Sequence, residues 1–173
     1  MDALIEAGAD VNAATANNGC TPLYIAAQNG HLALVTKLVA AGALVDKAMT
    51  TTGCTPLFIA AENGHLAVVT KLIAAGADVN TAETTSGFTP LYVAAQNGHL
   101  TVVTKLIAGG ADVDQAATDG CTPLYFAANN GHTAIVSKLL QHGADKSIRG
   151  FQIRTPLEAA QGQNHAAVVA LLA

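Results

Sequence analysis

Apolar and polar positions recur along the chain in blocks of fixed length. Residues 89–99 read TPLYVAAQNGH, an apolar run between a threonine and a polar end. Matching blocks occupy residues 21–31, 55–65 and 122–132, and a degraded copy occupies residues 155–165. Their opening threonines stand 34, 34, 33 and 33 residues apart. A period of this length is typical of a stacked repeat architecture.

Each block predicts one short helix. Thr89 can cap the first turn with its hydroxyl, Pro90 suits the first helical position, and Gly98 ends the helix. A second helix is expected over residues 99–107, closed by Gly109 and Gly110. Its apolar residues at helical spacing, expected on one face, are Leu100, Val103, Leu106 and Ile107. Helices under about 12 residues are too short to be stable alone, so stability must come from neighbouring helices.

The repeats predict a single elongated domain over residues 1–173. We expect a partial repeat at residues 1–16, which looks like the last half of a unit whose first helix is missing. Full repeats are expected at 17–50, 51–84, 85–117 and 118–150, followed by a terminal capping unit at 151–173. That last unit is atypical, because Asn164 replaces the glycine and Thr155 with Glu158 forms a capping box. Polar end units are what a stack requires.

The segments between the helix pairs are rich in Asp, Asn, Thr, Ser and Gly, which favour turns, and we expect projecting hairpin-like loops. Polar positions at the loop tips and at the ends of the first helices are candidates for partner recognition, with plain solvation and turn formation as the alternative. The candidates at the loop tips are Asn17, Asn18, Thr51, Thr52, Thr85, Ser86, Thr118 and Asp119. Those at the helix ends are Gln28, Asn29, Glu62, Asn63, Gln96, Asn97, Asn129 and Asn130.

The recurring TPLxxAAxNGH and GADVN motifs resemble those of ankyrin repeat proteins over nearly the whole chain. The resemblance implies an all-α solenoid of stacked helix-turn-helix units with projecting β-hairpin-like loops. It also implies a concave face of loops and first helices that binds other proteins. The chain departs from the family pattern where Tyr24, Phe58, Tyr92 and Tyr125 replace a histidine. It departs again at the lysines of the second helices and at the position two residues after each helix-start histidine.

The aromatic residues all lie in or beside the first helices and loops. Tyr24, Phe58, Phe88, Tyr92 and Tyr125 are therefore further candidates for partner contact. Packing between units is the alternative. It is favoured for Tyr24, Phe58, Tyr92 and Tyr125, which we call the aromatic ladder, because these residues are nearly identical from unit to unit. Phe126 is expected in the core.

Composition and charge limit the function and the compartment. A net charge of −4 argues against nucleic acid as a partner, and no apolar run is long enough for a membrane span. The three cysteines, Cys20, Cys54 and Cys121, occupy the same repeat position. Adjacent units should hold them about 8–10 Å apart, farther than a disulfide allows, so free thiols in a reducing compartment are expected. We expect an intracellular, cytoplasmic protein, with a nuclear location left open.

No catalytic residue, cofactor or metal site is predicted. Histidines occur once per unit at His31, His65, His99, His132 and His165, too far apart to share one metal ion, and a structural role is expected for them. Polar residues are periodic, whereas a catalytic site is unique.

The leading hypothesis is a non-catalytic scaffold that binds an unidentified protein through loops and first helices. A regulatory or targeting fragment of a larger enzyme or channel is the alternative, and a small-molecule or nucleotide binder is a weaker third. We expect a monomer, with weak self-association through the lysine-bearing outer face of the second helices left open.

Overall fold

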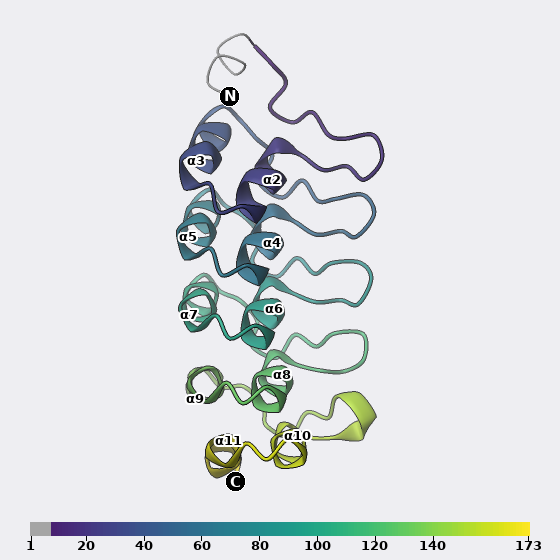
Figure 1. Ribbon diagram of the computed structural model, residues 1–173, viewed down its shortest axis with the longest axis vertical. Helices are drawn as coiled ribbons and strands as arrows, with labels where there is room; N and C mark the ends of the chain where they lie inside the picture. The colour runs from purple at the N-terminus through teal and green to yellow at the C-terminus, as the bar shows by residue number, and fades with distance from the viewer. Residues whose placement is uncertain (1–7) are drawn as a thin grey trace.

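The computed structural model describes residues 8–173, and the helices in that part form five pairs stacked along one axis (Figure 1). The first helices of the pairs are α2 (Pro22–Gln28), α4 (Pro56–Glu62), α6 (Pro90–Gln96), α8 (Pro123–Asn129) and α10 (Pro156–Gly162). The second helices are α3 (Leu32–Ala40), α5 (Leu66–Ala74), α7 (Leu100–Ala108), α9 (Thr133–Gln141) and α11 (Ala166–Leu172). A short 3₁₀ helix, η1 (Phe151–Ile153), lies in the last loop. No strand occurs within residues 8–173, so the all-α solenoid expectation is confirmed.

The first helices begin and end as the sequence predicts. In all five, the capping threonine accepts a hydrogen bond from the backbone N–H three residues later, at 3.1–3.3 Å. Proline follows the cap at the helix start. Helix α6 ends at Gln96, and Gly98 takes a φ of 82°, which a residue with a Cβ rarely adopts.

The second helices bury a different set of residues from the one predicted. In α7 the buried side chains are Val102, Val103 and Leu106, whereas Leu100 is exposed and Ile107 is half-buried. The expectation that Leu100 belongs to the packed face is therefore wrong. Helix α7 packs against α5, α6 and α9, and this three-sided environment buries Val102 while leaving Leu100 at the open start of the helix.

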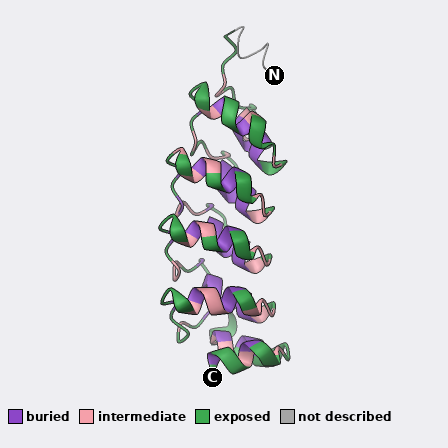
Figure 2. Ribbon diagram, turned by 90° about the vertical axis from the view of Figure 1, so that its left-hand side faces the viewer, coloured by how far each residue is buried: buried purple, intermediate pink, exposed green. Residues whose placement is uncertain are grey.

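The core consists of the contacts between successive pairs. Each first helix packs against the next first helix, and each second helix against the next second helix. In the first four helix pairs, the leucine after the Thr-Pro start is buried between units. The two alanines that begin three residues later are buried as well, as Leu91, Ala94 and Ala95 illustrate. Because the helices are only 7 to 9 residues long, most of their stability comes from this packing rather than from helix propensity. Figure 2 shows the complementary exposed stripe along the outer side of the second helices.

At each interface between helix pairs, a glycine of one unit packs closely against a histidine ring of the next unit. The Nε2 atom of His99 lies 3.0 Å from the backbone oxygen of Glu62 in the preceding unit. A Cβ atom placed on Gly64 would lie 2.7 Å from the His99 ring. Gly64 also has a φ of 74°. The same pairing joins Gly30 to His65, Gly98 to His132 and Gly131 to His165, so glycine at this position provides both the backbone angle and the room for the next unit.

The unit at residues 151–173 differs from the others at the glycine position. Asn164 stands at the glycine position and keeps a left-handed φ of 61°, which asparagine tolerates better than most residues. The capping box between Thr155 and Glu158 is present, as predicted. The expected partial repeat at residues 1–16 lies partly outside the described residues. The expected repeat boundaries stay a prediction, although each full repeat holds one helix pair.

Candidate partner-binding face

The loops form a regular row that projects from the first helices toward one side (Figure 1). Each is closed by a backbone hydrogen bond between its two arms, such as Glu83 N–H to Phe88 O at 2.9 Å. A second kind of backbone bond joins neighbouring loops: Thr50 N–H to Asn18 O, Thr84 N–H to Thr52 O, and Thr118 N–H to Ser86 O, at 2.8–2.9 Å. The loops are therefore hairpin-like without forming strands, and these backbone bonds join the first four loops in series.

The predicted loop-tip residues divide into two groups. Asn17, Thr51, Thr85, Thr118 and Asp119 are exposed. Asn18, Thr52 and Ser86 are half-buried, and their backbone oxygens accept the bonds between loops. The exposed group is not uniformly free: the Thr118 hydroxyl donates to Ser86 O at 3.0 Å, and Asp119 Oδ1 accepts a hydrogen bond from Cys121 N–H at 2.9 Å. The second group mainly holds the row together.

The predicted residues at the ends of the first helices also divide by exposure. Gln28, Asn29, Asn63, Asn97 and Asn130 are exposed, and Glu62, Gln96 and Asn129 are half-buried. Some of their polar atoms are already used. Asn97 Nδ2 donates to Glu62 O at 3.0 Å, and Asn130 Nδ2 donates to Gln96 O at 2.9 Å. These amides contribute to the interfaces between units, so their surfaces are held in fixed positions.

The aromatic ladder lies between the units. Tyr24, Phe58, Tyr92 and Tyr125 are all buried, and Tyr92 is 0% exposed. These rings offer almost no surface to a partner in this structure, because the neighbouring unit covers them. We therefore assign the four positions to packing and remove them from the proposed contact residues. Phe88, the fifth aromatic candidate, is half-buried.

Aromatic rings gather around Tyr92. Its ring stacks on Phe88 with centroids 4.2 Å apart and lies 5.2 Å from Phe126, which in turn meets Tyr125 edge-on at 5.4 Å. The hydroxyl of Tyr92 is buried and has no hydrogen-bond partner among the described residues. Burial raises the pKa of this phenol, with smaller contributions from Asp119, Cys121 and Tyr125, so it is neutral at any physiological pH.

Glu83 is a structural residue that the sequence reasoning missed. Its buried carboxylate accepts backbone hydrogen bonds from Thr85 at 2.6 Å, Ser86 at 2.5 Å and Phe88 at 3.2 Å. Burial alone would raise the pKa of this carboxyl, but the three N–H donors outweigh it and the net pKa is lowered. Glu83 thus shapes the third loop. The sequence feature that could have identified Glu83 is an isolated acidic residue just before a turn-forming segment, residues 84–87.

The cysteines and histidines serve the interfaces. Cys20, Cys54 and Cys121 are unbridged, as predicted. Burial raises the pKa of the Cys121 thiol to about 11, so it is not a nucleophilic thiolate at neutral pH. The rings of His65, His99, His132 and His165 each lie within hydrogen-bond distance of a backbone oxygen of the preceding unit. In the described part of the chain, no three His, Cys, Asp or Glu side chains are grouped to hold a metal ion.

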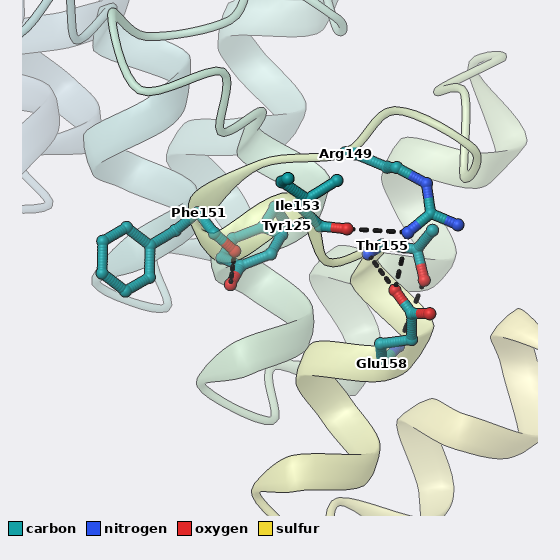
Figure 3. Close-up of polar contacts among 6 residues, drawn as sticks. All are labelled: Tyr125, Arg149, Phe151, Ile153, Thr155 and Glu158. Atoms are coloured by element: carbon teal, nitrogen blue, oxygen red, sulfur yellow. Dashed lines mark hydrogen bonds and ion pairs between the residues drawn. The ribbon is translucent and has the colours of Figure 1, made fainter.

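The last loop breaks the regular pattern. It contains η1, and Arg149 Nη1 bonds both to Ile153 O at 2.7 Å and to the Glu158 carboxylate at 3.3 Å. Figure 3 shows the Phe151 ring pointing away from this pair, while the Phe151 backbone oxygen accepts a hydrogen bond from the Tyr125 hydroxyl at 3.4 Å. No residue of this loop was among the predicted site residues, because it lacks the polar tip of the others.

Taken together, the stacked helix pairs and the projecting row of loops define a helical repeat protein with an extended surface. Matches to the family model described as ankyrin repeats (3 copies) cover residues 1–83, 44–117 and 91–173. The chain therefore belongs to the ankyrin repeat family, whose repeats generally serve as protein–protein interaction modules. No curated protein sequence matches it. The matches identify ankyrin repeats and no catalytic domain.

One further structural observation concerns membranes. Among residues 8–173, every helix is too short or too polar to cross a lipid bilayer.

Proposed function

We propose that this chain is a non-catalytic scaffold that binds a protein partner through the face formed by its loops and first helices. The observation that carries the proposal is the network of backbone bonds between loops, from Thr50 to Asn18, Thr84 to Thr52 and Thr118 to Ser86. A surface held in this way loses little conformational entropy when a partner binds, which favours affinity.

The chemistry of this face suits a protein partner better than a nucleic acid. Its exposed side chains are mostly amides and hydroxyls, such as Asn17, Thr51, Thr85 and Asn97. These groups can donate and accept hydrogen bonds with a polypeptide. A nucleic acid would require a row of cations to neutralise its phosphates, whereas the lysines at 37, 71, 105 and 138 lie on the second helices instead. An intracellular, cytoplasmic setting remains part of the proposal.

A pair of matched threonines tests which face binds. A photo-crosslinking amino acid replaces either Thr85, exposed at a loop tip, or Thr70, exposed on the second helix α5. Each full-length variant is irradiated in a lysate of the source cells, and adducts are resolved by mass. We expect protein adducts from the position of Thr85 and few from that of Thr70. Adducts from Thr70 alone would move the binding surface to the second helices and reject the proposed face.

A further inference from the structure

A cavity of about 440 Å³ lies where the last loop meets the first helices α8 and α10. Its walls come from separate parts of the sequence: the loop before α8, the helix α8, the 3₁₀ helix η1 and the end of α10. The residues used below are Asp119, Phe126, Asn129, Phe151, Arg154 and Gln163. We call this feature the last-loop cavity. Its volume is within the range of sites that hold a few side chains of a ligand.

One wall of the last-loop cavity is aromatic. Phe126 replaces the Ile or Val found at this position in the three preceding full units, and it is packed against Tyr92 and Tyr125. Phe151 is 55% exposed although it is a large apolar residue. Rigid aromatic surfaces of this kind dominate protein interfaces, and an apolar side chain of a ligand would cover them.

The polar side of the cavity has an available cation. Arg154 is exposed, and among residues 8–173 its guanidinium makes no direct hydrogen bond or ion pair, although its charge acts at longer range on Glu158 and Tyr125. Arg149 nearby is different, because it is paired with Glu158. A guanidinium matches a carboxylate in shape and charge. Asp119, also in the wall, already accepts a hydrogen bond from Cys121 N–H at 2.9 Å.

The backbone beside the cavity is strained. Gln152 and Ile153 have φ values of 57° and 61°. Ile153 stands two residues before the capping threonine, where the other loops carry Gly19, Gly53, Gly87 and Gly120 with positive φ. A β-branched residue is disfavoured there. The Ile153 side chain is 75% exposed, so packing within the stack does not explain it. Strain of this kind concentrates at binding sites.

We propose that the last-loop cavity binds a segment of a partner protein in which an acidic side chain lies next to a large apolar one. The carboxylate pairs with Arg154, and the apolar side chain covers Phe126 and Phe151. The amides of Asn129 and Gln163 are placed to bond the peptide main chain. This proposal rests on the proposed function, and it narrows the binding face to the junction of the last two units and to one partner chemistry.

The test selects ligands without assuming a partner. Short random peptides displayed on phage are selected against the full chain, and the best peptide is then titrated against variants. We expect the selected sequences to place Asp or Glu next to a large apolar residue. Arg154→Gln should weaken binding about tenfold, as loss of a charged hydrogen bond does. Phe151→Ala should weaken it about as much.

Matched controls separate the site from general effects. Lys71→Gln removes the same charge from the second helix α5, and Leu66→Ala shortens an exposed apolar residue of that helix, outside the proposed face. Both should leave the affinity unchanged, and circular dichroism should report the same helix content for all four variants. Peptides that lose affinity with substitutions at Thr85 or Asn97 but not at Arg154 would overturn the cavity proposal and leave the proposed function intact. Peptides sensitive only to Lys71 would reject both, and selection without any acidic–apolar pattern would overturn the cavity proposal.

Discussion

The Gly64–His99 interface makes a quantitative prediction about how the units are held together. Gly64→Ala should destabilise the protein more than Gly76→Ala. Both glycines have positive φ, 74° and 88°, so both alanines carry the left-handed penalty of roughly 1–2 kcal/mol. Alanine also restricts the unfolded chain, which returns about 0.4–1 kcal/mol. The net cost at Gly76, where a Cβ meets nothing within 4 Å, is therefore about 1 kcal/mol.

The extra cost at Gly64 comes from the neighbouring unit. A Cβ there would lie 2.7 Å from the His99 ring, so the ring must move and its contact with Glu62 O is lost. That loss adds about 1–3 kcal/mol. We expect a total near 2–4 kcal/mol for Gly64→Ala, measured by urea unfolding followed by far-ultraviolet circular dichroism.

A double-mutant cycle isolates the contact. In a His99→Ala background the ring is absent, so Gly64→Ala should cost only about as much as Gly76→Ala does. Equal costs for the two glycines in the parent protein, to within about 0.5 kcal/mol, would refute the idea that this glycine makes room for the next unit.

Three other substitutions test individual features. Tyr92→Phe should stabilise the protein by about 1 kcal/mol in urea unfolding, because it removes a buried hydroxyl without a partner; a loss of stability would contradict this. Glu83→Gln should destabilise most near neutral pH. Folding lowers the pKa of the Glu83 carboxyl below its usual value of 4.5, so the ionised carboxyl stabilises the folded protein above pH 4.5. This stability is lost as the pH falls through the folded pKa, and thermal melts of the two proteins should therefore converge in acid. Ile153→Gly should raise stability by about 0.5–1 kcal/mol through relief of the positive φ, whereas Ile153→Ala should not.

The regular part of the fold could be predicted because it depends on local rules. A threonine before Pro90 caps a helix wherever it occurs, and Gly98 ends one for reasons of backbone sterics. Repetition of these signals with a period of 33–34 residues then implies stacking. The unbridged cysteines followed from the spacing between units.

Other features depend on which residues meet in space. Leu100 and Val102 are both apolar, and only the positions of α5 and α9 beside α7 decide that Val102 is the buried one. The last-loop cavity joins Asp119 and Phe126 to Arg154 across two loops and two helices. Its residues do not repeat from unit to unit, so a search for periodic positions passes over them. Such a cavity becomes visible only in three dimensions.

The candidate binding residues lie between these two cases. The sequence placed loop tips such as Thr85 and helix ends such as Asn97 on one face, and both are exposed there. The sequence did not distinguish loop-tip residues with exposed side chains from those that join the loops. The backbone oxygens of Asn18 and Ser86 accept bonds from the next unit, which only the structure reveals. The aromatic ladder illustrates the same limit, because burial by the next unit decides its role.

Hydrogen exchange of the loop amides tests most directly whether stacking makes the loops one rigid face. The amides of Thr50, Thr84 and Thr118 each donate to the preceding loop, so two-dimensional NMR of the full chain in deuterated water should find them protected to nearly the same degree as amides in the helices. Exchange of these three amides at the rate of an unstructured peptide would mean that the loops move independently, and it would contradict a preformed binding surface.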